Sequence, residues 1–403
     1  MLAGFNTVLI VGLGLIGGSI AGAVKSKAPG TRIIGIDVDA EAVRQAQELG
    51  LIDEGITQRV GTAGVWTVPS FAGLIVPSFA DLTAQSFAGL TGESTEQRAP
   101  DLIILATPAG TFENWFRLIA ATGYTGLITD TASTKSAVIG TAKRILPDSK
   151  NFIPGHPMAG SEAGGIAAAR SDLFEGAYWI LTPDADTDPQ QFGALHGFIA
   201  ALGARPITVD PAEHDKAVAI ISHIPHIAAS SLVALAGKHS GEHGELLRLA
   251  AGGFKDTTRI AAGDPDLWTG IVTDNADVIA DELKELIGIL SDYEEKIRTG
   301  EKSEIRRNLA EAADLRKTLP AAKWVPATAK LIEMRIPMGN RPGIIAEITA
   351  AAGRMGCNIM AIEIDHLTER RAILDLVLSD EGNMQGFVDA LTAADYAPQI
   401  SEQ

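Results

Sequence analysis

The chain has 403 residues, of which 46% are hydrophobic, and its formal net charge is −17. This length exceeds that of most single domains, so we expect two or three domains, each with its own core. The negative charge disfavours nucleic acid and anionic membranes as main partners, because both require a basic face. The single cysteine, Cys357, excludes an intrachain disulfide and a cysteine-rich metal site, and it is compatible with a reducing cytoplasm.

Residues 7–11 (TVLIV) form an apolar run that leads directly into a glycine-rich turn and an alanine-rich segment. This order predicts a buried strand, a tight turn and a helix. Gly12 permits the turn, Gly14 leaves room for a pyrophosphate, and Gly17 lets the helix approach the strand. Residues 7–24 carry no charge, but five glycines interrupt them and no Lys or Arg precedes them. We therefore expect neither a membrane span nor a signal peptide there.

A second predicted strand, residues 32–36, ends at Asp37, which lies 20 residues after Gly17. An acid at this point accepts hydrogen bonds from the ribose hydroxyls of a dinucleotide and repels a 2′-phosphate. The combination favours NAD over NADP as cofactor. The alternative is a simple acid at the end of a strand, and Asp39 is close enough to share the role.

After a predicted helix over residues 41–49, the pattern degrades into three related units, VPSFAGL, VPSFADL and AQSFAGL, at residues 68–74, 76–82 and 84–90. A repeat of eight residues is too short to build a solenoid layer. We interpret residues 61–99 as an insertion at the surface, without an assigned function.

The next predicted strand, residues 101–106, ends at Thr107 and Pro108, where strand ends face the cofactor in a doubly wound sheet. Residues 127–129 then lead into the sequence DTASTK and a helix that runs to about residue 146. Asp130 or Ser133 is suited to cap that helix. Alternatively, Ser133 and Lys135 point into the cleft.

Residues 152–166 (FIPGHPMAGSEAGGI) begin with a predicted short strand over 152–154. The stretch shows neither helical nor strand periodicity as a whole, so we expect a loop around His156. His156 within it is a candidate proton acceptor near neutral pH, although a histidine that merely fills a turn is the commoner case. Residues 178–182 and 205–209 are predicted to be the last strands of the same layer.

From Asp210 the sequence becomes helical in period and remains so to about residue 319. Asp210 is suited to be an N-cap, with Pro211 in the first helical position. A long apolar stripe favours a dimer core for this block. Its members are Ile279, Leu283, Leu286, Ile287, Leu290 and Ile297.

The first predicted helix of this block contains His214, His223 and His226, but the spacing does not suit a metal site, so we expect none. Pro225 is expected to kink the helix and to expose His226 to a cleft. Arg259, farther along, is suited to hold a carboxylate through two of its guanidinium nitrogens, or else to bridge two helices in a salt bridge.

Residues 320–328 are predicted to be a linker, and residues 329–403 a βαββαβ module of α+β class. Cys357 lies at one of its corners between helix and strand and is expected to be a packing residue.

Taken together, these motifs resemble the prephenate dehydrogenase family, with a C-terminal domain similar to the ACT regulatory fold. The resemblance rests on several segments in the same order: GLGLIGGS, Asp37, ATP at 106–108, DTASTK at 130–135, GHPMAGSE at 155–162, HDKAVAIISHIPH at 214–226 and GGFKDTTRIAAGDPDLW at 252–268. It implies an α/β Rossmann-type domain over residues 1–210, an all-α dimerisation domain over 211–319 and an ACT-like domain over 329–403. It also implies a cytoplasmic homodimer.

The resemblance implies the oxidative decarboxylation of prephenate to 4-hydroxyphenylpyruvate in tyrosine synthesis. His156 would accept the proton of the ring hydroxyl, and Ser133 would orient that hydroxyl. Arg259 would hold a substrate carboxylate, with His226 and Lys255 at the other end of the substrate. Glu162 and Asp215 would gate the pocket or form ion pairs around it, and Trp268 would reach across a dimer interface. The residues around NAD would be Gly12, Gly14, Leu15, Ile16, Gly17, Asp37, Thr107 and Pro108.

The ACT-like domain would bind tyrosine as a feedback inhibitor at the turn Asn340, Arg341, Pro342 and Gly343; the alternative is a structural or dimerising module. Two departures from the family pattern are the repeat over 61–99 and the residues around Ser133. Arogenate dehydrogenase, or a cyclohexadienyl dehydrogenase that accepts both substrates, is the nearest rival. A 3-hydroxy-acid dehydrogenase or imine reductase, and a non-catalytic effector-binding protein, are more remote.

Overall fold

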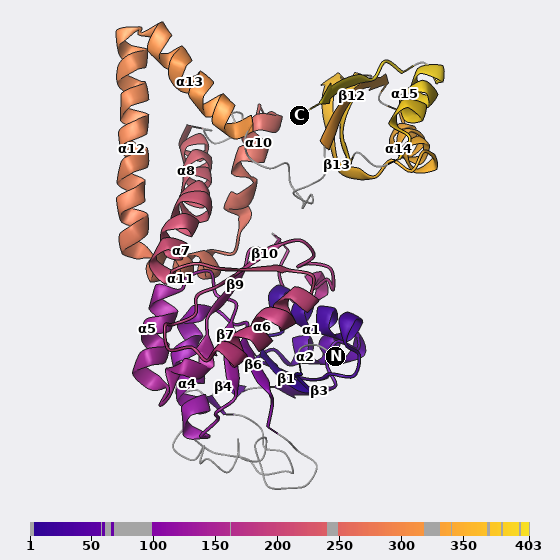
Figure 1. Ribbon diagram of the computed structural model, residues 1–403. Helices are drawn as coiled ribbons and strands as arrows, with labels where there is room; N and C mark the ends of the chain where they lie inside the picture. Colours follow the sequence, from indigo (N-terminus) through magenta and orange to yellow (C-terminus); the bar gives the residue numbers. More distant parts are fainter. Residues whose placement is uncertain are drawn as a thin grey trace. The chain divides into compact units, whose positions relative to one another are not determined.

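The computed structural model describes residues 4–57, 59–60, 66–67, 99–161, 163–239, 249–317, 331–339, 341–368, 371–379, 382–394 and 396–402. The chain divides into two compact units, Met1–Arg298 and Thr299–Gln403, which are described separately (Figure 1). Most of the repeat-bearing segment 61–99 and the predicted linker 320–328 lie outside the described residues. Within the former, only β5 (Trp66–Thr67), paired with β4 (Arg59–Val60), and residue 99 are described.

The first unit is built on a six-stranded parallel sheet in the order β3-β2-β1-β6-β7-β8. Its strands are β1 (Thr7–Val11), β2 (Arg32–Asp37), β3 (Glu54–Thr57), β6 (Leu102–Leu105), β7 (Leu127–Asp130) and β8 (Phe152–Ile153). The chain leaves β1 in one direction to β2 and β3, and returns on its other side through β6, so the order reverses between β1 and β6. This is the doubly wound arrangement, in which ligands bind at the point of reversal. The predicted Rossmann-type sheet is confirmed.

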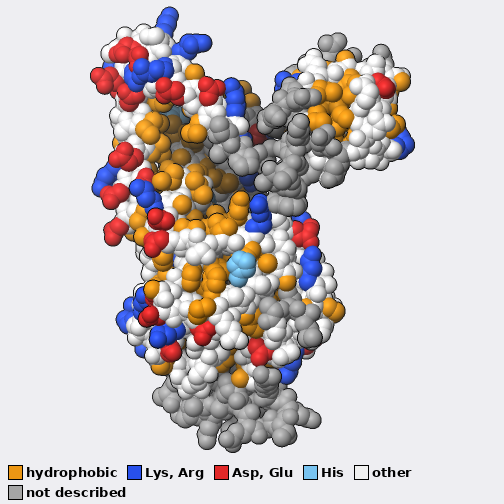
Figure 2. All heavy atoms as spheres, in the orientation of Figure 1, with side chains coloured by type: hydrophobic (Ala, Val, Ile, Leu, Met, Phe, Trp, Pro, Cys, Tyr) orange, Lys and Arg blue, Asp and Glu red, His pale blue; other side chains and the backbone are white. Residues whose placement is uncertain are grey.

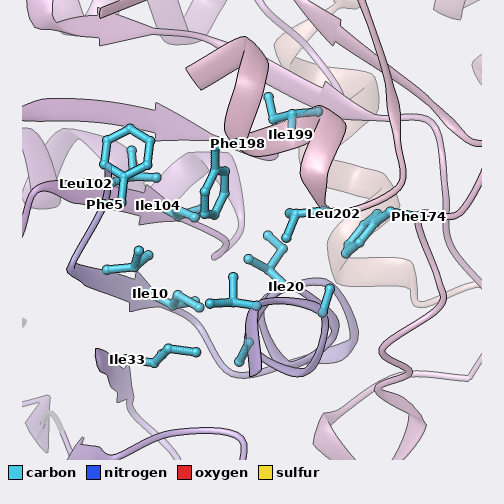
Figure 3. Close-up of a cluster of buried hydrophobic side chains, with 14 of the residues drawn as sticks. Phe5, Ile10, Ile20, Ile33, Leu102, Ile104, Phe174, Phe198, Ile199 and Leu202 are labelled. Carbon is cyan, nitrogen blue, oxygen red and sulfur yellow. The ribbon is translucent and has the colours of Figure 1, made fainter. Parts of the chain in front are cut away.

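Both faces of this sheet are covered, which explains why its strands are continuous apolar runs rather than alternating ones. On one face, Ile10 of β1 packs with Ile20 of α1 (Leu15–Lys27) and Phe198 of α6 (Pro189–Ala201) (Figure 3). The residues that flank Ile10 on β1 point to the opposite face of the sheet. There Leu9 belongs to a second core that includes residues of α4 (Phe112–Ala121) and α5 (Ser136–Ile145). Helix α2 (Ala40–Glu48) contributes buried residues to the first core.

Three further strands form a separate sheet in the order β11-β10-β9. The sequence had predicted that two of them continue the main sheet and that the third is part of a loop. They are β9 (Gly155–Pro157), β10 (Tyr178–Leu181) and β11 (Arg205–Thr208), and β9 pairs antiparallel with β10. The prediction that residues 178–182 and 205–209 continue the main layer was therefore wrong, and His156 lies on a strand rather than in a loop. A physical reason is Pro154, which cannot donate a backbone hydrogen bond and so ends the pairing of β8.

The helical part of the first unit begins at α7 (Pro211–Val218), where Asp210 Oδ1 accepts hydrogen bonds from the Ala212 and Glu213 N–H groups at 2.9 and 3.3 Å. The N-cap prediction is confirmed. A π-turn, η4 (Ala219–His223), joins α7 to α8 (Ile224–His239). The remaining elements are α10 (Gly252–Thr258), η5 (Arg259–Ala262), α11 (Pro265–Asp274) and α12 (Ala276–Thr299). We expected a kink at Pro225, and the structure has instead the wider π-turn Ala219–His223 just before this proline.

The predicted apolar stripe on α12 is divided between core and surface. Ile279 is 3% exposed and packs in a cluster with residues of η4 and α8, whereas Leu290 is 59% and Ile297 66% exposed. Figure 2 shows hydrophobic side chains gathered in the hollow beside α12 and α8. Within the described residues, one continuous helical segment, Pro211–His239, is long and apolar enough to span a membrane by composition alone.

The second unit contains α13 (Lys302–Lys317) and a four-stranded antiparallel sheet in the order β13-β14-β12-β15. Its elements follow the expected βαββαβ order: β12 (Leu331–Gly339), α14 (Ile344–Arg354), β13 (Ile359–Thr368), β14 (Arg371–Ser379), α15 (Met384–Ala393) and β15 (Gln399–Glu402). Helices α14 and α15 share one core with the sheet, and Cys357 is buried in that core, as expected for a packing residue.

Candidate active site

The glycine turn after β1 has the geometry that its sequence predicts. Gly12 has φ of +95°, and a Cβ added there would lie 2.6 Å from the carbonyl oxygen of Ala106. A Cβ on Gly17 would lie 1.9 Å from the carbonyl oxygen of Gly12, whereas nothing lies within 4 Å of one on Gly14. Gly12 and Gly17 therefore allow close packing, and Gly14 keeps open the space that a pyrophosphate needs. Leu15 and Ile16 follow as the first, half-buried residues of α1.

Asp37 ties the glycine turn to the end of β2. Its Oδ2 accepts a hydrogen bond from the Leu13 N–H at 2.6 Å, and its Oδ1 accepts one from the Asp39 N–H at 2.9 Å. Asp39 in turn caps α2, because its Oδ1 accepts from the Glu41 N–H at 2.9 Å. Each Asp37 oxygen has one protein donor, which leaves further lone pairs for ribose hydroxyls.

A pocket of about 340 Å³ opens beside this turn. It is lined by Leu13, Gly14, Asp37, Asp39, Glu41, Ala42, Gln45, Gly165, Ile166 and Ala167. The three acids among these residues disfavour a 2′-phosphate by charge repulsion. The open space at Gly14 and the carboxylate of Asp37 fit the adenosine and pyrophosphate of NAD.

Thr107 and Pro108 follow β6 at the sheet edge where the turn lies. A Cβ on Gly12 would come within 2.9 Å of Thr107 Cγ2, which places this threonine against the turn. The Thr107 hydroxyl lies 2.7 Å from that of Thr111, and the Pro108 carbonyl accepts from the Thr111 N–H at 2.9 Å. The structure therefore brings the predicted cofactor residues together around one edge of the sheet.

A chain of three side chains runs from His156 into the helical part of the unit. His156 Nδ1 lies 2.9 Å from His214 Nε2, and His214 Nδ1 lies 2.8 Å from Asp215 Oδ1. His214 is fully buried on α7. The pKa of His156 is held well below its usual value of 6.5, because burial and the nearby Lys135 ammonium both disfavour its protonated form. His156 is thus a neutral imidazole, suited to accept a proton.

Asp215 also caps α5 from 80 residues away: its Oδ1 accepts from the Lys135 N–H and its Oδ2 from the Ser136 N–H, both at 2.8 Å. The expectation that Asp130 or Ser133 caps this helix was wrong. These hydrogen bonds, with that of His214, lower the pKa of Asp215 to about 2 despite the opposing effect of burial, so Asp215 is ionised.

Lys135 is fully buried rather than pointing into a cleft, so that alternative was wrong for Lys135. Its Nζ donates to Asp130 Oδ2 at 2.5 Å and to the Gly155 carbonyl at 2.6 Å. Asp130 Oδ1 accepts from the Gly155 N–H at 3.0 Å. This ion pair therefore holds both backbone polar groups of Gly155, the residue that precedes His156. Ser133 lies half-buried on the same loop, two residues before Lys135.

A second cluster adjoins Asp215. Asn275 Nδ2 donates to the Asp215 carbonyl at 2.8 Å and lies 3.4 Å from His223 Nδ1. Burial lowers the pKa of His223 to about 4. His226 stacks on Trp268 with ring centroids 3.5 Å apart. Contrary to the expected exposure, His226 is buried, with 8% of its surface exposed.

The two predicted cations are less enclosed. Lys255 lies on α10 and Arg259 begins η5, and both are exposed. Both elements contact α8, the helix that carries His226. Glu162 lies outside the described residues. Among the residues that the structure does describe, no group of three or more His, Cys, Asp or Glu side chains is arranged to hold a metal ion.

Sequence reasoning missed His214 and the pocket wall at residues 165–167. The adjacent His214 and Asp215, one helical turn after the Asp210 cap, were a usable signal of a buried polar pair. The wall is packed on α1: a Cβ on Gly18 would lie 2.5 Å from Ile166 Cδ1. No periodicity in the sequence predicts such a contact between a helix glycine and a loop far along the chain.

A doubly wound sheet with this glycine turn, an acid at the end of β2 and a neutral histidine linked to a carboxylate define an NAD-dependent dehydrogenase. Residues 85–208 match the family described as "Prephenate dehydrogenase, nucleotide-binding domain", and residues 210–311 match "Prephenate dehydrogenase, dimerization domain". The prephenate dehydrogenase of Bacillus subtilis is 37% identical over 375 residues, which cover 89% of this chain and 88% of the relative. The chain belongs to the prephenate dehydrogenase family.

Two solved structures extend the comparison. The prephenate dehydrogenase of Aquifex aeolicus in complex with hydroxyphenyl propionate and NAD⁺ is 28% identical, with a TM-score of 0.65 over 78% of this chain and 98% of the other. The arogenate dehydrogenase of Synechocystis is 29% identical, with a TM-score of 0.58 over 78% of this chain and 100% of the other.

Proposed function

We propose that this enzyme oxidises prephenate with NAD and releases CO2, yielding 4-hydroxyphenylpyruvate for tyrosine synthesis. The observation that carries the proposal is His156, a neutral imidazole linked through His214 to the ionised Asp215. NAD, when bound, supplies the hydride acceptor. The work of the chain is to bind, orient and deprotonate the substrate.

His156 takes the proton of the ring hydroxyl while hydride leaves the same carbon. Loss of the carboxylate on the opposite ring carbon then makes the ring aromatic. General base assistance of this kind is typically worth ~10²–10⁴-fold. Ser133, on the loop that Lys135 anchors, orients the hydroxyl. The remaining acceleration comes from holding the substrate against the cofactor.

Prephenate carries two carboxylates, and a protein with net charge −17 must present cations locally to bind it. Arg259 and Lys255, exposed close to α8, are the proposed carboxylate ligands. His226 and Trp268 are proposed to line the substrate pocket beside these two cations, His226 as a polar residue and Trp268 as a largely apolar one. Glu162 is proposed to gate the entrance. Asp215, by contrast, acts inside the protein through His214 and α5 rather than as a gate.

The nearest rival substrate is arogenate, which has an amino group where prephenate has a keto group. The likeness to the Synechocystis arogenate dehydrogenase keeps this alternative open, as well as an enzyme that accepts both substrates. A 3-hydroxy-acid dehydrogenase would leave His156 and Arg259 without a role. A non-catalytic effector-binding protein would not need the glycine turn or His156, and both are present.

The helical domain is proposed to form a cytoplasmic homodimer. Leu290 and Ile297 of α12, and Leu235 of α8, expose 56–66% of their surface in the single chain, and apolar stripes of this kind are usually covered by a partner. The family match over residues 210–311 carries the description of a dimerisation domain. Trp268 is proposed to lie near this interface.

The C-terminal βαββαβ unit is proposed to be an ACT-like regulatory domain that binds tyrosine at the turn between β12 and α14. Gly343 at that turn has φ of +84°. Arg341 donates from Nη2 to Glu347 Oε2 at 2.6 Å and carries a cation suited to an amino-acid carboxylate. Asn340 lies outside the described residues, and Pro342 is exposed. A purely structural module is the alternative.

The test is NADH formation with prephenate and with arogenate, for the wild type and for His156→Asn. We expect turnover of prephenate that collapses in the variant while NAD binding is retained. Turnover of arogenate alone would identify arogenate as the substrate and leave the proposed mechanism unchanged. No turnover of either, with NAD bound, would reject the proposal. Added tyrosine should inhibit the wild type and not Arg341→Ala; equal inhibition of both would reject the effector site.

A further inference from the structure

His214 is buried between two groups and has both ring nitrogens occupied. Its exposed fraction is 0%, its Nε2 lies 2.9 Å from His156 Nδ1, and its Nδ1 lies 2.8 Å from Asp215 Oδ1. A buried imidazole with two partners must donate to one and accept from the other if it is neutral. The direction of the two hydrogen bonds is therefore a chemical property of the site, and it can be worked out from the partners.

Asp215 determines that direction. Its carboxylate is ionised and also accepts from the Lys135 and Ser136 N–H groups, so it has no proton to donate. In its neutral form, His214 must therefore carry its hydrogen on Nδ1 and present a lone pair on Nε2. His156, facing that lone pair with Nδ1, must donate from it. The ring nitrogen of His156 that stays unprotonated is Nε2.

We propose that His214 is a positioning residue that holds His156 in the tautomer with hydrogen on Nδ1, so that Nε2 is the proton acceptor. This inference rests on the proposed function, because the acceptor role of His156 is part of it. In the reaction, the proton moves from the substrate hydroxyl oxygen to Nε2, and the electron pair of the broken O–H bond remains with the substrate. His156 then carries a positive charge.

The groups around His156 suit this cycle. Before the transfer, the Lys135 ammonium and burial keep the ring neutral, and His223 lies within electrostatic range as a further, uncharged neighbour. After the transfer, the negative charge of Asp215 stabilises the His156 imidazolium, and His214 lies hydrogen-bonded between the two groups. Asp215 does not need His214 for its role at α5, because both of its oxygens already accept from backbone N–H groups. The two roles of Asp215 are thus separable by changing His214.

The experiment combines nitrogen-15 NMR of histidine-labelled enzyme with kinetics, for the wild type, His214→Leu and His214→Gln. His156→Asn assigns the resonances of His156. We expect the wild type to show hydrogen on Nδ1 of His156, and His214→Leu to lose that preference. By analogy with a catalytic triad whose histidine is left in the wrong tautomer, kcat should fall by at least ~10-fold, with KM for prephenate and NAD unchanged.

His214→Gln supplies an amide oxygen toward His156 and an amide N–H toward Asp215, so it should recover part of the kcat that the leucine variant loses. His196→Asn, at an exposed histidine on α6, is the matched control and should behave as wild type. Hydrogen on Nε2 of His156 in the wild type would overturn the proposal, as would an unchanged kcat in His214→Leu. A fall in kcat explained entirely by lost folded enzyme would also overturn it. If the wild type turns over neither substrate, the proposed function fails, while the NMR still decides the tautomer.

Discussion

The Nζ of Lys135 lies 2.5 Å from Oδ2 of Asp130, and both side chains are completely buried. Burial alone would favour the neutral forms, since it raises the pKa of Asp130 and lowers that of Lys135, and their mutual attraction opposes both effects. The pair also forms hydrogen bonds with the N–H and the C=O of Gly155, the residue before His156. It therefore fixes the strand that carries the proposed base.

Replacement of one partner should be severe. Lys135→Met leaves a buried carboxylate without its cation, and we expect a loss of ~3–5 kcal/mol in the free energy of unfolding. The double variant with Asp130→Asn should recover part of that loss, because it removes the unpaired charge. Denaturant unfolding of the three proteins measures it. A double variant less stable than Lys135→Met would contradict this explanation.

The pH dependence of kcat/KM should report the lowered pKa of His156. A base is active when it is unprotonated, and burial and Lys135 keep its pKa well below 6.5. We expect kcat/KM for prephenate to stay level as the pH falls through 6.5 and to decline only at lower pH. A pH–rate profile with NAD saturating tests this. An acid limb centred at or above pH 6.5 would show that the base is solvated.

Stability should depend on pH through His223. Its pKa is about 4 in the folded protein and 6.5 in the unfolded chain, so the unfolded state binds more protons between these values. Its stabilising contribution is complete above pH 6.5 and is lost as the pH falls toward 4, up to roughly 3 kcal/mol. His223→Asn should flatten this part of the curve of unfolding free energy against pH. An equally steep curve in the variant would assign the effect elsewhere.

Asp37→Asn should weaken NAD selectively. The change keeps the size of the side chain but removes its charge, and a hydrogen bond to a charged group is worth ~1.5–3 kcal/mol. We expect the KM for NAD to rise at least ~10-fold with little change in kcat, and the discrimination against NADP to shrink. Asp188→Asn, at the exposed N-cap of α6, is the control, because asparagine caps helices equally well. An unchanged KM for NAD would remove Asp37 from the cofactor site.

The exposed end of the α12 stripe should be needed for dimerisation. Leu290→Lys and Ile297→Lys place charges where we expect a partner chain, and each lost apolar contact costs ~1.5–3 kcal/mol of association free energy. Sedimentation should find the double variant monomeric at concentrations where the wild type is dimeric. Lys284→Ala, on the same helix and 74% exposed through its side chain, should leave the dimer intact. A double variant that stays dimeric would place the interface elsewhere.

Local sequence rules predicted much of the fold. The first strand has the expected residues, Thr7–Val11, and the C-terminal module has the expected order of strands and helices, with α14 at Ile344–Arg354 and α15 at Met384–Ala393. These elements have a clear period and clear end signals, which act over a few residues. The glycine turn and Asp37 were predictable for the same reason.

The parts that were missed depend on contacts between distant residues. Asp215 caps a helix 80 residues upstream, and His214 meets His156 across 58 residues. The sheet of β9, β10 and β11 begins after Pro154, which ends the edge strand of the main sheet. No local sequence pattern predicts which strands the chain pairs with after that proline. The burial of Lys135 likewise depends on Asp130 and Gly155 converging on it.

The π-turn Ala219–His223 interrupts what would otherwise be one regular helix. Each residue of an α-helix advances it by about 100°, so one residue accommodated in a wider turn rotates everything downstream relative to everything upstream. His214 faces His156 before the turn, and His226 faces Trp268 after it. Deletion of a single residue here would leave the composition of both halves intact and turn one set of side chains away from the other. A one-residue insertion or deletion in this stretch would therefore change the orientation of His226 relative to His214 while leaving the rest of the framework in place.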